Sequence, residues 1–361
     1  SGKPTLFFLA LDKVVGAAWT LGTNYYKVNI PIDETLAATQ PTGMSNFSAL
    51  YGANGEVTQI YAGDFHGKVW KLNFTDLNNK TSGYKPTTDW NMDKLSSFNR
   101  GTATSPLPYP FYIAKDSAGN VQPITVAPSL FTGPIVKGVE SFYVLIGTGK
   151  YLESGDNLST RTQSVYALYD NGSTSADASP IVSAISGRSR LQAGTVDTST
   201  RKINITAFTW GRPETNADAT QRSGWYFDLP ATGEKLVSSI SDLGNLTATF
   251  NTLIPGISGA AAACTTNEGS GKQYTVNVAS GKGDYVESIV GVLGESIFLT
   301  NADKTEVSKF DSTGRAIRKT TKQAIQVGSK GTGAGKSVVV EETIGRLSWR
   351  QIYNYQDLRN K

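Results

Sequence analysis

Ile60-Tyr61-Ala62-Gly63-Asp64-Phe65-His66-Gly67-Lys68-Val69-Trp70-Lys71-Leu72 is the stretch that indicates the fold most clearly. It predicts a strand, a turn around His66 and Gly67, and a second strand that carries Val69 and Trp70 close to the turn. Glycine supplies the positive φ that tight hairpins need, and β-branched and aromatic residues favour the flanking strands. The segment therefore predicts a β-hairpin.

Looser copies of this unit recur along the chain. They lie at residues 6–21 with a turn near Gly16, and at Val165–Gly172, Trp225–Gly233, Tyr274–Gly281 and Lys309–Arg315. Periods of about 40–50 residues with one antiparallel sheet each are typical of propeller blades. A single hairpin cannot bury both of its faces, so stacked sheets are the expected solution. We predict an all-β propeller; generic hairpins of a β-sandwich are the alternative.

Length and composition agree with a β-rich fold. The 361 residues suffice for two ordinary domains or for one propeller of about seven blades. A hydrophobic content of 39% is ample for a packed core. Helical periodicity is confined to Asp89–Asn99 and, more weakly, Leu236–Leu243, and no apolar run approaches the roughly 18–20 residues of a membrane helix. Ser1-Gly2 suggests that the native start of the protein precedes this sequence.

Few residues could carry catalysis. His66 is the single histidine, and its position in a turn predicts an exposed residue rather than a catalytic base. Cys264 is the single cysteine and is expected to be a structural or exposed thiol. With one histidine and one cysteine, histidine-rich zinc or iron sites are excluded, and few residues could form a catalytic nucleophile–base pair. We expect no catalytic or cofactor-binding residues.

Two segments near the C-terminal end have simple interpretations. Gly331–Ser337 resembles a phosphate-binding loop, but Lys330 stands where the first glycine is required and Val338–Val340 predicts a strand instead of a helix. We therefore interpret it as a flexible glycine-rich connector. Basic residues in 315–322 could meet an anionic surface, but protection of an exposed strand edge explains them better. No recognition element for nucleic acid accompanies them.

Four segments in order resemble the C-terminal domain of the PilY1/PilC family, the tip-associated adhesins of bacterial type IV pili. The first runs from Tyr61 to Leu72 and is close to a Tyr-Ala-Gly-Asp-Leu-x-Gly-Asn-Leu-Trp core. The second comprises Ile146–Leu152, Asp156 and Gln163–Asp170. The third runs from Gly224 to Lys235 and leads to Leu253–Pro255 and Cys264; the fourth is Gly345–Ile352.

The resemblance implies a modified seven-bladed β-propeller with long loops and few short helices. Residues 1–361 would form a single C-terminal domain, and a von Willebrand factor A-like N-terminal region would lie outside this sequence. The implied function is non-enzymatic: support of pilus biogenesis by opposing retraction, with roles in adhesion, twitching motility and DNA uptake. Implied partners are minor pilins, other tip components and a surface receptor, and the implied location is the pilus tip or outer membrane.

Two further functions stay open from the sequence. A quinoprotein-like propeller enzyme would need a cofactor pocket with calcium and a catalytic aspartate, and neither is evident. An envelope scaffold would act only by binding other proteins. The loops that would carry adhesive contacts are Lys80–Tyr112, Asn171–Arg188 and Pro255–Gly271, chosen for length and polarity.

Many relatives carry a calcium loop before the Tyr-Ala-Gly-Asp segment. Its ligand positions correspond here to Leu50, Gly52, Asn54 and Thr58, with Gly55 retained. Calcium requires several oxygen ligands, usually carboxylates, and none of these four residues supplies a carboxylate. We therefore expect no calcium site in this loop, and a hairpin turn at Asn54-Gly55 in its place.

Overall fold

Strands dominate the protein, as the sequence predicts. The computed structural model describes residues 2–344 apart from 77, 80, 81, 103, 136, 137, 213–219, 257–268, 296 and 311–315. Within them the helices are short: α1 (Glu34–Ala37), α2 (Met92–Leu95), and the 3-10 turns η1 (Thr87–Asp89), η2 (Asp156–Leu158) and η3 (Arg188–Arg190). Among these residues no helix has the length and apolar character needed to cross a lipid bilayer.

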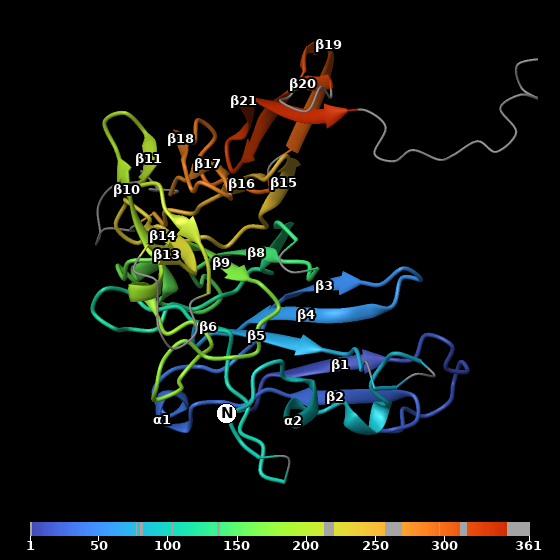
Figure 1. The fold of residues 1–361 in the computed structure, drawn as a ribbon. Helices are drawn as coiled ribbons and strands as arrows, with labels where there is room; N and C mark the ends of the chain where they lie inside the picture. The colour runs from blue at the N-terminus through green and yellow to red at the C-terminus, as the bar shows by residue number, and fades with distance from the viewer. Residues whose placement is uncertain are drawn as a thin grey trace, which may run out of the picture.

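The N-terminal part forms two stacked sheets. Strands β1 (Thr5–Leu9) and β2 (Tyr25–Asn29) make an antiparallel ribbon. It packs on a four-stranded antiparallel sheet of β3 (Phe47–Tyr51), β4 (Val57–Gly63), β5 (Lys68–Asn73) and β6 (Tyr112–Ile113). Leu6, Val28, Trp70 and Leu72 are buried in the core between them. Figure 1 shows these blue and cyan strands together at one end of the molecule.

A ten-stranded sheet forms the centre of the molecule. In spatial order it contains β15 (Ser241–Gly244), β16 (Thr247–Asn251), β17 (Lys272–Asn277), β18 (Gly283–Glu287), β11 (Lys202–Ile205), β10 (Gln192–Asp197), β14 (Gly224–Asp228), β9 (Ser164–Asp170), β8 (Phe142–Gly147) and β7 (Ser129–Thr132). The sheet curls until it is nearly closed: Ser129 of β7 donates from Oγ to the carbonyl oxygen of Ile240, beside β15, at 3.1 Å. Trp225, Phe227, Phe250 and Tyr274 belong to the core cluster that packs within it.

The central sheet joins two blade-like units. Strands β7-β8-β9-β14 form one and β15-β16-β17-β18 the other, and the β10–β11 hairpin connects them. β10 pairs in parallel with β14, and β11 pairs antiparallel with β18. The expected β-propeller architecture therefore occurs in a modified form, in which neighbouring units share hydrogen bonds. The expected number of seven blades remains a prediction, because these units are not separate sheets.

The C-terminal sheet contains the long strands β19 (Ile297–Phe310), β20 (Ala316–Gly328) and β21 (Gly331–Ile344). A small pair, β12 (Thr209–Trp210) and β13 (Gln221–Arg222), lies apart from it in the topology. The predicted connector at Gly331–Ser337 is wrong, because these residues pair with β20 as part of β21. The predicted edge position of the basic residues is also wrong, because β20 is the middle strand and Arg318 forms an ion pair with Glu342 of β21.

The repeated hairpins are confirmed only in part. β4–β5 turns at Gly67 and β17–β18 turns near Gly281, as predicted. The prediction of a hairpin that turns near Gly16 is wrong, because β1 pairs with β2, which begins only at Tyr25. No return strand follows Gly172 or Gly233, because β9 and β14 already have a partner on each edge. β19 and β20 form a hairpin whose turn at Gly314 lies outside the described residues.

The two predicted helices are mostly wrong. Within Asp89–Asn99 the α-helix is limited to α2, which ends at Leu95, and Asn91 caps its first turn by accepting from the Lys94 N–H. Leu236–Leu243 is not helical. The Leu236 N–H is donated to the Thr148 carbonyl oxygen at 2.9 Å, and Ser241 already belongs to β15. Pairing with distant strands therefore overrides a weak local helical pattern.

A buried ion pair connects β5 to β9. The Lys71 ammonium lies 2.7 Å from Asp170 Oδ2, and the Tyr61 hydroxyl donates to the same oxygen at 2.7 Å. Tyr61 and Lys71 are cross-strand partners in β4 and β5, so both side chains leave the same face of the hairpin. Burial alone would raise the pKa of Asp170, but the Lys71 charge and the hydrogen bonds lower it below the ordinary value. The carboxylate therefore holds two sheets together in its ionised form.

The β4–β5 turn is closed around a buried carboxylate. Asp64 Oδ1 accepts from the N–H groups of His66 and Lys68, and Oδ2 accepts from Trp70 Nε1 at 3.0 Å. Gly67 has φ of +74°, and a Cβ there would lie 2.6 Å from the Ala114 carbonyl oxygen. Both the conformation and the close approach of backbone require glycine at this position.

Replacing Asp170 with Asn should destabilise the protein by about 3–5 kcal/mol at pH 7, because Lys71 is left buried without its counter-charge. Since the folded-state pKa of Asp170 is lowered, its contribution is present above the ordinary aspartate pKa and is lost as pH falls below about 4. Denaturant unfolding of both proteins at several pH values measures this. The double variant Lys71→Met, Asp170→Asn should be more stable than Asp170→Asn alone. If the unfolding free energies of wild type and Asp170→Asn differed by less than about 1 kcal/mol at every pH, the buried ion pair would not contribute as described.

Replacing Gly67 with Ala should cost about 2–5 kcal/mol, because the left-handed conformation and the contact with Ala114 are both unfavourable. Gly55→Ala is the matched control. Gly55 has φ of +85°, but nothing lies within 4 Å of its added Cβ. Gly55→Ala should therefore lower the free energy of unfolding by only about 1–2 kcal/mol. Equal unfolding free energies for the two variants would show that the turn at Gly67 is not closely packed.

Candidate functional site

His66 is buried, and the prediction of an exposed turn residue is wrong. Only 3% of the residue is exposed, because neighbouring chain covers the β4–β5 turn. The Gly67 carbonyl oxygen accepts from the Ala114 N–H at 2.8 Å, and the Phe65 N–H is donated to Gly43 at 2.9 Å. His66 Nε2 is buried and has no hydrogen-bond partner among the described residues. The histidine is therefore part of the packing at a junction between units.

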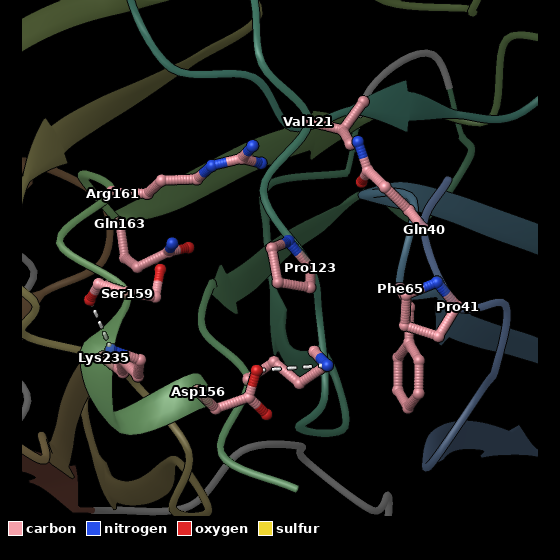
Figure 2. A pocket seen from close by; sticks show the side chains of 11 residues that line it. Gln40, Pro41, Phe65, Val121, Pro123, Asp156, Ser159, Arg161, Gln163 and Lys235 are labelled. Atoms are coloured by element: carbon pink, nitrogen blue, oxygen red, sulfur yellow. Dashed lines mark hydrogen bonds and ion pairs between the residues drawn. The ribbon is translucent and has the colours of Figure 1, made fainter. Parts of the chain in front are cut away.

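A cleft of about 180 Å³ opens beside this turn. Gln40, Pro41 and Phe65 form one wall, and Val121 and Pro123 lie between the walls (Figure 2). The opposite wall consists of polar and charged residues: Lys150, Asp156, Ser159, Arg161, Gln163 and Lys235. The cleft thus lies where the β4–β5 turn, the β8–β9 connection and the segment after β14 meet.

The segment Gly147-Thr148-Gly149-Lys150 shapes the polar wall. β8 ends at Gly147, in agreement with the prediction of a strand end. Gly149 has φ of +144°, and a Cβ there would lie 2.7 Å from Lys235 Cβ. Glycine therefore allows the Lys235 segment to pack directly against the end of β8. These glycines serve packing between strands and do not form a phosphate loop.

Lys150 and Asp156 neutralise each other in this wall. Lys150 Nζ lies 3.1 Å from Asp156 Oδ1 and also forms an ion pair with Glu153. The other oxygen, Asp156 Oδ2, accepts from the N–H groups of Leu152 and Glu153 at 2.8 and 2.9 Å. Burial alone would raise the pKa of Asp156, but these hydrogen bonds and Lys150 lower it below its usual value. The charged groups of Lys150 and Asp156 therefore already have partners within the protein.

Lys235 is buried in a different environment. Its residue is 2% exposed, and Nζ donates to the carbonyl oxygens of Ser159 and Gly233 at 3.1 and 2.9 Å. Burial lowers the pKa of Lys235, and the charge of Asp156 opposes this only in part. No carboxylate lies within ion-pair distance of Lys235 among the described residues. The ammonium is therefore a buried cation held by neutral acceptors.

Arg161 and Gln163 complete the wall. Arg161 is exposed, and within the described part of the chain it makes no ion pair or side-chain hydrogen bond. Gln163 is 5% exposed, and its Oε1 atom is buried without a partner. Figure 2 shows Arg161, Gln163, Ser159 and Lys235 following one another along the same wall.

A polar network lies directly behind this wall. Ser164, adjacent to Gln163, donates from Oγ to Asp228 Oδ1 at 2.6 Å and accepts from Gln122 Nε2 at 2.8 Å. Arg188 lies 2.9 Å from the same Asp228 oxygen and 4.4 Å from the centre of the Tyr226 ring. Because these groups satisfy one another, the network holds the start of β9 in place.

Three of the four segments that carry the family resemblance meet at the cleft. The first contributes Phe65, the second Lys150, Asp156 and Gln163, and the third Lys235. The fourth, Gly345–Ile352, lies outside the described residues. The motifs in the sequence indicate these segments but not their convergence, and no motif distinguishes Arg161.

The calcium-loop positions form the β3–β4 hairpin. Gly52 and Glu56 close the turn, with the Gly52 N–H donated to the Glu56 carbonyl oxygen at 2.8 Å, and Gly55 adopts φ of +85°. The Glu56 carboxylate accepts from the Asn54 N–H at 2.9 Å and from the Tyr84 hydroxyl. Leu50 pairs with Gln59 across the hairpin, and Thr58 Oγ1 donates to the Leu50 carbonyl oxygen.

Two of the three predicted adhesive loops pack together. Ala184 and Ile185 donate their N–H groups to the carbonyl oxygens of Pro110 and Phe111 at 2.9 and 3.0 Å. The Tyr109 hydroxyl donates to Thr174 at 3.2 Å. Lys80–Tyr112 and Asn171–Arg188 therefore share one rim. Most of the third loop, including Cys264, lies outside the described residues.

Comparison with known proteins identifies relatives. The family model described as the PilY1 beta-propeller domain matches residues 34–207. The type IV pilus biogenesis factor PilY1 of Pseudomonas aeruginosa strain PAO1 is 30% identical over 223 residues, which are 57% of this chain and 18% of the relative. A PilY1 homolog of Xylella fastidiosa is 26% identical over 274 residues, 74% of this chain and 16% of the relative. The chain thus spans less than a fifth of these relatives.

A solved structure shares the fold. The crystal structure of the Pseudomonas aeruginosa PilY1 C-terminal domain matches with a TM-score of 0.52 and 20% identity, covering 81% of this chain and 61% of that one. The match extends well beyond the residues that the family model covers. These matches in sequence and fold support a PilY1-family protein, in which residues 34–207 are similar to the family's β-propeller domain.

Proposed function

We propose that this chain acts in type IV pilus biogenesis as a non-enzymatic module that binds other proteins. The observation that carries the proposal is the match to relatives named type IV pilus biogenesis factor. The residues that the family model matches, 34–207, include all of the residues that line the cleft except Lys235. We also propose a single domain, and the core clusters that successive sheets share within the described part of residues 2–344 support it. A rigid β-sheet scaffold with loops gathered on one rim is suited to recognition.

The finer role follows the family resemblance. At the pilus tip or outer membrane, the module would oppose retraction, contact minor pilins and support adhesion, twitching motility and DNA uptake. The shared rim of Lys80–Tyr112 and Asn171–Arg188 is the candidate adhesive surface. Leu107 and Val182 are about half exposed there and offer apolar contact area to a surface receptor.

Deletion of the coding gene should abolish or strongly reduce surface pili and twitching, and the wild-type gene should restore both. If the module opposes retraction, pili should reappear in a deletion strain whose retraction is also blocked. Electron microscopy and twitching-zone diameters measure these outcomes. Normal piliation and twitching in the deletion strain would overturn the proposal. Substrate turnover with bound pyrroloquinoline quinone, measured by absorbance, would overturn the non-enzymatic role.

The hairpin at residues 50–58 should bind no calcium. Glu56 is the one carboxylate in the turn, and its oxygens already accept from Asn54 and Tyr84. Calcium needs about six to eight oxygen ligands. Isothermal titration of the metal-free protein with calcium should show no heat attributable to this loop, and Asn54→Ala should give the same trace. Micromolar binding that Asn54→Ala abolishes would contradict this expectation.

A further inference from the structure

The buried lysines of the described residues differ in how their charge is balanced. Lys71 and Lys272 each lie 2.7 Å from a carboxylate, Asp170 and Glu234 respectively. Lys235 is equally buried, but it contacts only the carbonyl oxygens of Ser159 and Gly233. An ammonium has three N–H donors, so one remains for another acceptor. Burying a cation without an anion is costly, and a bound anion would remove that cost.

The groups next to Lys235 point to the same kind of ligand. Arg161, on the same wall, is a second cation that has no partner among the described residues. Gln163 Oε1 is an unpartnered acceptor buried in the cleft wall between them. Lys150 takes no part, because it already forms ion pairs with Asp156 and Glu153. The wall therefore offers two cationic donors and one acceptor.

We propose that this cleft binds the C-terminal carboxylate of a peptide chain. The carboxylate would accept from Arg161 and Lys235, and the last peptide N–H would donate to Gln163 Oε1. Arginine suits such a group because its planar fork matches a carboxylate. Pro41 and Phe65 of the facing wall, with Pro123 between the walls, would receive an apolar last side chain. A bare inorganic anion would leave both the Gln163 acceptor and the apolar wall unused.

This inference rests on the proposed function, because a module that assembles with other proteins meets their chain ends. It names the ligand class but not the partner. Binding to purified protein does not depend on pilus assembly, so failure of the binding test leaves the biogenesis proposal standing. Loss of piliation in a deletion strain, conversely, says nothing about the cleft.

The test is titration of the whole 361-residue chain with a dye-labelled peptide, dye-Gly-Ala-Leu with a free C-terminus, followed by fluorescence polarisation. The free-acid peptide should bind, and the same peptide with a C-terminal amide should bind about tenfold more weakly or not at all. Arg161→Gln should weaken binding of the free acid about tenfold. Arg161 is exposed and has no ion pair or side-chain hydrogen bond among the described residues, so this variant should keep the wild-type thermal midpoint.

Lys282→Gln is the matched control, because it removes one positive charge from an exposed position outside the cleft and should leave the affinity unchanged. Lack of binding by the free acid at millimolar concentration would overturn the proposal. Equal binding of acid and amide, or equal affinity of wild type and Arg161→Gln, would do the same. Equal binding of acetate, or of an amidated peptide carrying an internal Asp, would overturn recognition of a chain end.

A second measurement avoids substitutions. In wild-type protein, the side-chain amide resonance of Gln163 should shift on addition of the free-acid peptide, because its oxygen acquires a donor. The amidated peptide at the same concentration should leave it unchanged. A free acid that binds without moving this resonance would show that the ligand occupies another site and would overturn the assignment.

Discussion

The Asp170 carboxylate, with Lys71 and Tyr61, is the contact on which the arrangement of the sheets depends. It lies between the β4–β5 hairpin and β9, where 1% of Asp170 is exposed. Side chains alternate between the faces of a strand, so a one-residue slip of β5 would turn Lys71 away from Asp170. The two charges would then be buried separately, at high cost. The pair thus specifies one register of the hairpin against the neighbouring unit.

The same strands place the cleft. β9 carries Asp170 at its end and Ser164 at its start, and Gln163 immediately precedes it. The β4–β5 hairpin carries Lys71 along its length and Phe65 at its turn. A shift between hairpin and strand would therefore move one wall of the cleft against the other. Because the packed hairpin fixes the walls before any ligand arrives, little further ordering is needed on binding.

Sequence analysis predicted what is local and missed what depends on distant partners. The turns at Gly67 and Gly281 follow from glycine and flanking apolar residues, and both form. No local feature at Gly172 shows that β8 and β14 occupy both edges of β9. The sequence around His66 predicts an exposed turn for the same reason, because residues 114–124, which cover this turn, are distant in sequence. The motifs that resemble the family are recognisable in the sequence, but the convergence of Phe65, Gln163 and Lys235 at one cleft is evident only from the fold.

The distribution of buried charge separates structural lysines from one available to a ligand. Lys71 and Lys272 have carboxylates supplied by neighbouring strands, so their positive charges are balanced when the chain folds. Lys235 could have been balanced by Asp156, which lines the same cleft, but that carboxylate binds Lys150 and two backbone N–H groups. Burial lowers the pKa of Lys235, and the charge of Asp156 opposes this only in part. An anion entering beside Arg161 would meet the Lys235 ammonium, which has no carboxylate within ion-pair distance among the described residues, where water is partly excluded. Electrostatic attraction is stronger there than at the open surface.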